Sequence, residues 1–235
     1  SDGVIVLDPI VLDGAPGSGK STIVEELAAI VAGGFRRISF SAAETGAQIG
    51  GSASSWSNST IGAVFDALVN GRWGNPLFLL DELDRTSRDS RFSPLGPLFQ
   101  LLEPAMSRSF QDLSVPSLTI NASRILWMAS SNESDRIPEA IRQRFAHFDV
   151  PYPVGTQSHA VAQSVLQRLA LAEPVIGRFT ITPQAVDVLA KHPPRVMRRL
   201  IRIGCGKAAV DARFEVRPED LPPAVAQKTR MGFCA

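Results

Sequence analysis

Residues 14–21 read GAPGSGKS and stand between the apolar run at residues 9–12 and a segment of helical character at residues 22–31. The stretch fits the pattern G-x-x-x-x-G-K-[ST], in which a glycine-rich turn directs backbone N–H groups at phosphate oxygens. Because the context of strand, loop and helix is the one that this pattern requires, an ordinary glycine-rich turn is the weaker interpretation. The stretch therefore predicts a nucleotide-binding α/β fold. It leaves the class of protein open, since kinases, GTPases, nucleic-acid motors and protein-remodelling ATPases all use such a loop.

Within this loop, the side chains suggest ATP and Mg²⁺ as ligands. We expect Lys20 to neutralise the β- and γ-phosphates and the hydroxyl of Ser21 to ligate Mg²⁺. The helix that follows adds the positive end of its dipole. The full predicted ATP-binding set is Gly14, Pro16, Gly17, Ser18, Gly19, Lys20, Ser21 and Thr22.

The composition is that of a globular protein. The chain has 235 residues, of which 44% are hydrophobic and 20% are charged, and its formal net charge is +1. Such a balance argues against a non-specific nucleic-acid binder. Cys205 and Cys234 lie far apart without a zinc or disulfide spacing, which favours a reducing compartment. Because no apolar run approaches the about 20 residues of a membrane span and the first residues do not resemble a signal peptide, we expect a cytoplasmic protein with no membrane partner.

Short β-branched runs alternate with longer amphipathic segments through most of the chain, which is typical of βαβ units. We predict an α/β domain at residues 1–152, a P-loop NTPase fold with a three-layer αβα sandwich and a parallel sheet. The predicted strands are residues 9–13, 37–41, 76–81, 124–130 and 146–150, and the predicted helices lie near 21–31, 61–70, 94–102 and 138–144. Two prolines and a glycine at residues 151–155 then break this pattern, and the later periodicity is helical. We predict a small all-helical domain at residues 153–235.

The segment PLFLLDELDR occupies residues 76–85. Its four consecutive apolar residues predict a fully buried central strand, with Asp81 and Glu82 at the carboxyl end, where open α/β sheets bind their ligands. We expect Asp81 to hold Mg²⁺ and Glu82 to polarise the water that attacks the γ-phosphate. A pair of carboxylates that merely caps the strand is the alternative. Because phosphoryl transfer to a small acceptor does not need a carboxylate at this position, the pair favours ATP hydrolysis over kinase chemistry.

Four further polar residues are candidates for the same site. Asn132 follows a second apolar strand and would stand beside Asp81 if the two strands are neighbours, although an asparagine at a strand end is often only a turn former. Arg142 and Arg144 lie near the end of a short predicted helix, from which a guanidinium could reach the γ-phosphate on a neighbouring subunit. Arg195 falls in the first turn of a helix, where the helix dipole disfavours a cation, and this hints at an anionic partner.

Taken together and in this order, these segments resemble an AAA+ ATPase module, and the nearest resemblance is to the ATPase part of the Lon proteases. The resemblance runs from Pro9 to Phe233. Its most specific parts are PLFLLDELDR at residues 76–85, LFQLLEPAMSRSFQDLSVP at 98–116, IPEAIRQRF at 137–145 and PRVMRRLIRIGCGKAA at 194–209. Generic phosphate-loop proteins share none of the last three.

The resemblance implies a role for each candidate. It makes Asn132 the sensor-1 residue, Arg144 the arginine finger with Arg142 as the alternate, and Arg195 the sensor-2 arginine. It also places Trp56 at the aromatic position of a pore loop that grips substrate polypeptide. Lon-type loops carry basic residues before this aromatic, whereas residues 52–55 here are small and neutral.

We therefore expect a Mg²⁺-dependent ATPase that forms a homo-oligomeric ring, a hexamer by the resemblance, and that couples ATP hydrolysis to unfolding, translocation or remodelling of protein substrates. The small helical domain would act as its lid. No Ser/Lys dyad can be assigned, so protease activity is not expected from this chain. Two alternatives stay open: a nucleic-acid-handling AAA+ motor, and a nucleotide-gated scaffold with little turnover.

Overall fold

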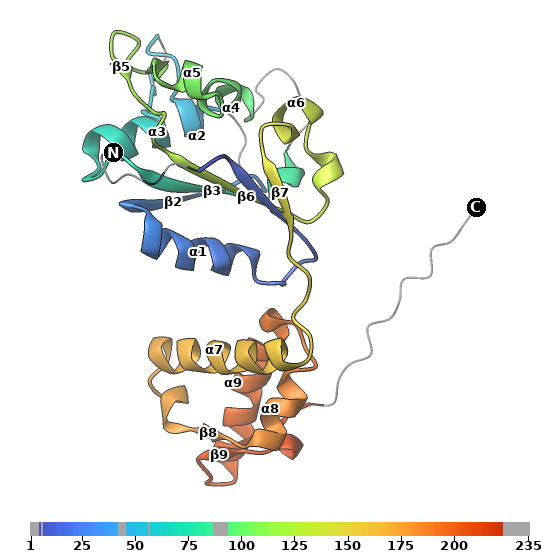
Figure 1. Cartoon of the computed structure of the whole chain (residues 1–235). Coiled ribbons are helices and arrows are strands. Elements are labelled where there is room, and N and C mark those ends of the chain that lie inside the picture. Colours follow the sequence, from blue (N-terminus) through green and yellow to red (C-terminus); the bar gives the residue numbers. More distant parts are fainter. Residues whose placement is uncertain (1–4, 6, 42–45, 56, 87–93, 223–235) are drawn as a thin grey trace. The chain divides into compact units, whose positions relative to one another are not determined.

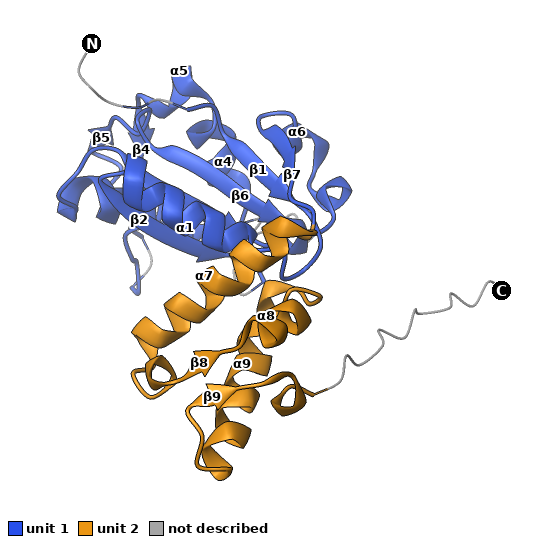
Figure 2. Ribbon diagram, turned by 60° about the horizontal axis from the view of Figure 1, so that its bottom comes forward, with its two compact units in different colours: residues 1–151 blue, residues 152–235 orange. Residues whose placement is uncertain are grey.

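The computed structural model describes residues 5, 7–41, 46–55, 57–86 and 94–222. The chain divides into two compact units, residues 1–151 and 152–235 (Figure 2). This division falls one residue before the expected boundary between residues 152 and 153. The assignment of a nucleotide-binding role to one unit and a lid role to the other stays a prediction.

The first unit is built on a parallel sheet whose strands run in the order β2-β3-β6-β1-β7 (Figure 1). The strands are β1 (Ile10–Asp13), β2 (Gly34–Ser39), β3 (Pro76–Asp81), β6 (Leu126–Ser131) and β7 (Ala146–Asp149). β3 pairs with β6, and β6 pairs with β1, so the carboxyl ends of these three strands meet at one edge of the sheet. The sheet confirms the predicted fold class.

Successive side chains of β3 point to opposite faces of the sheet, so this strand contributes to the hydrophobic core on both faces. Leu77 and Leu79 pack on one face with Val24 and Ala28 of α1 (Lys20–Val31). Phe78 and Leu80 point to the other face and join the larger core, which includes residues of α2, α3, α4 and α6. All four apolar side chains of the strand, Leu77, Phe78, Leu79 and Leu80, are fully buried. A strand covered on both faces must be apolar throughout, and this is why its sequence carried such a clear signal.

Short elements complete the first unit. They are α2 (Ala47–Gly50), α3 (Ala63–Phe65), the π-helical turn Asp66–Asn70, α4 (Gly96–Leu101), α5 (Pro104–Ser107), α6 (Glu139–Arg142), two 3₁₀ turns (Leu83–Arg85 and Ser134–Arg136) and a hairpin of β4 (Phe110–Gln111) and β5 (Thr119–Ile120). In Figure 1, α1 lies on one side of the sheet and α2 to α5 on the other.

The second strand differs in its bounds from the prediction. We predicted residues 37–41, and the structure has Gly34–Ser39. Its ladder with β3 begins with Gly34 opposite Pro76. Glycine has low β propensity, so the pairing with β3 and not the local sequence decides where this strand starts.

The second unit consists mainly of α7 (Thr156–Ala172), α8 (Pro183–Leu189) and α9 (Pro194–Val210), with 3₁₀ turns at Ile176–Arg178 and Pro218–Asp220. Leu169, Leu189, Met197 and Ile201 are among the residues that form its core. The expectation of helices alone needs one correction. A parallel ladder joins β8 (Thr180–Ile181) to β9 (Glu215–Val216), two strands too short to leave a periodic pattern in the sequence.

Among the residues that the structure describes, there is no helix with the length and apolar character needed to span a bilayer.

Candidate functional site

The loop at residues 14–19 leads from β1 into α1 and adopts backbone conformations that suit phosphate binding. Gly14 has φ 153°, and a Cβ atom there would lie 2.4 Å from the carbonyl oxygen of Val150. Gly19 has φ 104°, in the left-handed region that favours glycine. The hydroxyl of Ser18 is buried and has no hydrogen-bond partner among the described residues. A buried polar group usually has a partner, so a loop with a free hydroxyl beside a helix N-terminus fits a phosphate ligand.

Lys20 is the first residue of α1 and is 7% exposed. Its ammonium group donates hydrogen bonds to the carbonyls of Gly14 at 2.6 Å and Ala15 at 3.1 Å, and to Oδ1 of Asn132 at 3.1 Å. Burial lowers the pKa of Lys20, and the nearby carboxylates, of which Asp13 acts most strongly, offset part of this effect. The lysine is thus held at the sheet edge by the loop and by the end of β6.

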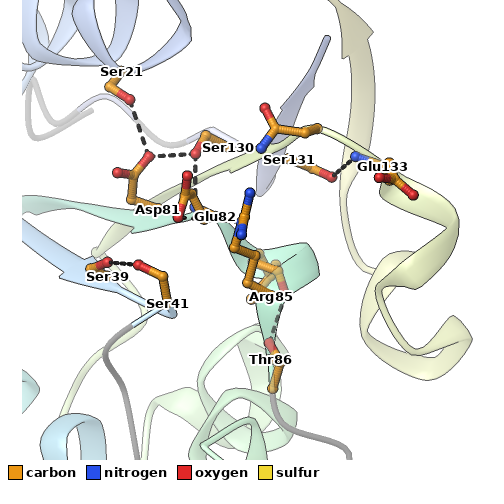
Figure 3. Close-up of polar contacts among 12 residues, drawn as sticks. Ser21, Ser39, Ser41, Asp81, Glu82, Arg85, Thr86, Ser130, Ser131 and Glu133 are labelled. Atoms are coloured by element: carbon orange, nitrogen blue, oxygen red, sulfur yellow. Dashed lines mark hydrogen bonds and ion pairs between the residues drawn. The ribbon is translucent and has the colours of Figure 1, made fainter. Parts of the chain in front are cut away.

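Asp81 ends β3, and its side chain is 8% exposed. Oδ1 accepts hydrogen bonds from the hydroxyls of Ser21, at 3.1 Å, and Ser130 (Figure 3). Oδ2 accepts hydrogen bonds from Nε, at 3.1 Å, and Nη2 of Arg37. Burial raises the pKa of Asp81, but the hydrogen bonds from Ser130 and Arg37 outweigh it, so the pKa lies below its ordinary value. The carboxylate is therefore held in its charged form. With the Ser21 hydroxyl it supplies the hard oxygen ligands that fit Mg²⁺.

Glu82 follows Asp81 directly and has φ 56° and ψ 49°, a left-handed conformation. Its backbone N–H donates to the hydroxyl of Ser130 at 2.9 Å. Its carboxylate lies 3.5 Å from Nε of Arg85, one helical turn later. Figure 3 shows Glu82 beside Asp81 at the ends of β3 and β6. The left-handed turn places two successive carboxylates at the same edge.

Arg37 and Ser130 are site residues that the sequence reasoning missed. Ser130 is 2% exposed and links the side chain of Asp81 to the backbone of Glu82. Its small polar character at the end of an apolar strand was the only available signal. Arg37 lies in β2, and its role depends on the parallel register that places Ser39 beside Asp81. Nothing in the local sequence indicates that contact.

Arg142 and Arg144 are in different environments. Arg142 forms ion pairs with Asp135 and Glu139, and the hydrogen bonds with Glu139 raise the pKa of the guanidinium. Arg144 donates to the carbonyl of Ala140 and lies over the ring of Phe99, 5.6 Å from its centroid. Nε of Arg144 is buried without a partner, and the part of the chain that the structure describes offers it no ion pair. Within the described residues, the guanidinium group of Arg144 therefore has fewer charged partners than that of Arg142.

The described residues of the first unit do not include the remaining two candidates. Arg195 is exposed in the first turn of α9, which belongs to the second unit. Trp56 lies outside the described residues.

The fold and the arrangement of loop, paired carboxylates and amide are those expected of a phosphate-loop ATPase. Residues 10–152 match the family described as "ATPase family associated with various cellular activities (AAA)". The chain belongs to this family. Membership supports ATP hydrolysis, with Mg²⁺ as the typical partner ion.

Within the family, the chain is similar to Lon proteases. It is 29% identical over 188 residues to a Lon protease of Mesomycoplasma hyopneumoniae (strain 232). The aligned region covers 79% of this chain and 22% of that protein. It is 32% identical over 133 residues to the "Lon protease homolog 2, peroxisomal" of Caenorhabditis elegans, or 56% of this chain and 17% of that protein. The chain thus spans about a fifth of the length of these curated relatives.

The fold is also similar to that of a solved structure described as the Thermotoga maritima RuvB Holliday junction branch migration motor. The TM-score is 0.61 at 16% identity, and the match covers 92% of this chain and 60% of that one. At this identity the similarity concerns the fold alone.

Proposed function

We propose that this chain is the ATP-hydrolysing module of a Lon-like ring and that it uses hydrolysis to unfold, translocate or remodel protein substrates. The observation that carries the proposal is the cluster of Lys20, Asp81, Glu82 and Asn132 at one edge of the sheet. Lys20 contacts Asn132, and Ser21 of the phosphate loop contacts Asp81. One Mg·ATP at this edge would touch all of these groups.

Each residue of the cluster has its own role in the proposed hydrolysis. The backbone N–H groups of the loop and the ammonium of Lys20 bind the β- and γ-phosphates of the substrate ATP. Ser21 and Asp81 would hold Mg²⁺, which when bound would neutralise charge on the phosphate oxygens. Glu82 accepts a proton from the attacking water, and Asn132 orients that water.

We infer that a neighbouring subunit completes each site. Arg144 is the proposed source of the arginine, because its guanidinium makes no ion pair within the described residues whereas Arg142 makes two. A cation beside the γ-phosphate stabilises the charge that develops during phosphoryl transfer. Such a contact between unlike surfaces of identical chains generates a ring when the rotation between neighbours closes. A hexamer is the proposed ring size.

Substrate contact is assigned to the loop at residues 48–59, of which Trp56 would be the gripping residue. The described stem of this loop is anchored at both ends. Ser52 N donates to the carbonyl of Thr60 at 3.0 Å, and Gly62 N donates to Oδ2 of Asp112 at 2.9 Å. Asp112 is fully buried next to β4 of the hairpin. A loop so anchored would move with the hairpin, as a substrate-dragging loop must.

In the second unit, Arg195 is the proposed contact to the γ-phosphate. Loss of this phosphate on hydrolysis would release Arg195 and let the lid move against the α/β domain.

The decisive experiment measures the ATPase rate of the purified chain alone, with a denatured protein and with DNA. We expect stimulation by denatured protein. Stimulation by DNA alone, falling steeply with salt, would replace the proposal with the nucleic-acid motor. Nucleotide binding without turnover under every condition, including high protein concentration, would replace it with the nucleotide-gated scaffold.

A further inference from the structure

We propose that Arg37 competes with Mg²⁺ for Asp81 and that it transfers to Glu25 when the metal binds. The inference rests on the proposed function because it concerns the same nucleotide site. It adds Arg37 as a positioning residue. By occupying Asp81, Arg37 sets how strongly nucleotide binding depends on magnesium.

The contacts of Asp81 leave little room for another ligand. Oδ1 accepts hydrogen bonds from the hydroxyls of Ser21 and Ser130, and Oδ2 accepts two from the guanidinium of Arg37. A carboxylate offers about four lone-pair sites in total. All four are engaged in this arrangement, and the side chain is 8% exposed, so bulk water has little access to it.

The two oxygens differ in what Mg²⁺ binding requires of them. Ser21 can ligate a metal through its oxygen and still donate its proton to Oδ1 of Asp81. The oxygen left for Mg²⁺ or for a metal-bound water is Oδ2, where Arg37 sits. A guanidinium this close also repels a divalent cation, since both carry positive charge. Metal entry and the full Arg37–Asp81 contact therefore exclude each other.

Glu25 provides the alternative partner. It lies on α1, and its Oε1 is already 3.7 Å from Nη1 of Arg37. β2 is an edge strand, and the side chains of Arg37 and Glu25 are each 48% exposed, so the guanidinium has room to rotate. If Arg37 leaves Asp81, it still has Glu25 as an ion-pair partner.

The test compares the affinity of the full chain for a fluorescent non-hydrolysable ATP analogue in excess Mg²⁺ and in EDTA. The ratio of the two dissociation constants, EDTA over Mg²⁺, reports how strongly the site uses the metal. The solution equilibrium between metal and nucleotide is common to all variants and cancels in the comparison. We expect Arg37→Gln to raise this ratio about three- to tenfold, because a competing cation is removed. We expect Glu25→Gln to lower it about two- to threefold, because Arg37 loses its alternative partner.

Arg36→Gln is the matched control. Arg36 neighbours Arg37 on the same strand and pairs at 3.6 Å with Asp66, which makes no contact with Asp81, and its side chain is 46% exposed. This variant should leave the ratio unchanged. The double variant Arg37→Gln/Glu25→Gln should behave like Arg37→Gln alone, since Glu25 acts only through Arg37.

The direction of the change separates competition from a purely structural role. If Arg37 only orients Asp81, Arg37→Gln weakens the use of Mg²⁺ and the ratio falls, which overturns the proposal, as does an unchanged ratio. Glu25→Gln alters only a half-exposed side chain and gives an independent answer should Arg37→Gln fold poorly. If the unaltered chain binds no nucleotide at all, the proposed function fails and not this inference alone.

Discussion

Glu82 adopts a left-handed backbone conformation that costs a non-glycine residue about 1 to 3 kcal/mol. The hydrogen bond from its N–H to the buried hydroxyl of Ser130 offsets part of that cost. The same hydroxyl donates to Asp81. One serine thus fixes the relation between the two carboxylates, the proposed magnesium ligand and the proposed general base.

At this residue scale, Glu82→Gln tests the proposed general base. The amide has the same shape and leaves the backbone contact to Ser130 in place, but it cannot accept the proton of the attacking water. We expect ATP binding to stay within about twofold and turnover to fall by about 100-fold or more. Equilibrium nucleotide binding and steady-state phosphate release check this. Turnover at the unaltered rate would remove Glu82 from the role.

Arg144→Ala tests the proposed trans-acting arginine. Loss of a guanidinium that stabilises transferring phosphate should reduce turnover by about 1000-fold, with unchanged nucleotide affinity of the isolated subunit. Arg142→Ala is the comparison, because Arg142 is engaged by Asp135 and Glu139 at the surface, and we expect it to change turnover by less than about threefold. The reverse ranking of the two variants would transfer the role to Arg142.

At the scale of elements, the 3₁₀ turn Pro218–Asp220 of the second unit is anchored by a buried carboxylate. Asp220 is 3% exposed and accepts hydrogen bonds from Nη1 and Nη2 of Arg213 and from the backbone N–H of Arg217. The hydrogen bonds from Arg213 lower the pKa of Asp220. This contact holds the turn after β9 against the segment that leaves α9.

Asp220→Ala should therefore destabilise the second unit by about 2 to 4 kcal/mol at neutral pH, since it leaves Arg213 without its buried partner. Asp211→Ala is the matched control. Asp211 pairs with the same guanidinium, but its side chain is 60% exposed, and its loss should cost less than about 1 kcal/mol. Denaturant unfolding followed by circular dichroism measures both. Equal losses in the two variants would show that burial of Asp220 is not what matters.

The pH dependence of this contact follows from the direction of the shift. Because the pKa of Asp220 is lower in the folded state, its contribution is complete above the unfolded-state pKa of about 4 and is lost as the pH falls through the folded-state pKa. The stability difference between the unaltered chain and Asp220→Ala should therefore shrink as the pH falls below about 4.

At the scale of the whole molecule, sites shared between subunits allow two inactive variants to complement each other. An Arg144→Ala subunit keeps its own Glu82, and a Glu82→Gln subunit keeps the arginine that its neighbour lacks. Random mixing in equal amounts should restore activity to roughly a quarter of the sites, since half of the subunits have a functional base and half of their neighbours supply the arginine. Phosphate release from the mixture measures this. Failure to regain activity in rings shown to have exchanged subunits would place the arginine in cis.

Much of the site could be predicted from the sequence. The phosphate loop is one continuous segment, so all of its phosphate-binding groups can be recognised from adjacent residues. β3 is buried on both faces, and its run of apolar residues before Asp81 and Glu82 made both the strand and its end visible. The position of Asn132 beside Lys20 depended on the pairing of β6 with β1, which the sequence could only suggest.

The sequence by itself determined the class of fold, the phosphate loop and the order of the two units, because each depends on local patterns of loop, burial and helical period. Only the tertiary structure decided that Arg37 and Ser130 saturate Asp81, that Arg142 is engaged while Arg144 makes no ion pair in the described chain, and where β2 begins. These contacts join residues far apart in the chain. They follow from strand register and side-chain packing, which no short stretch of sequence contains.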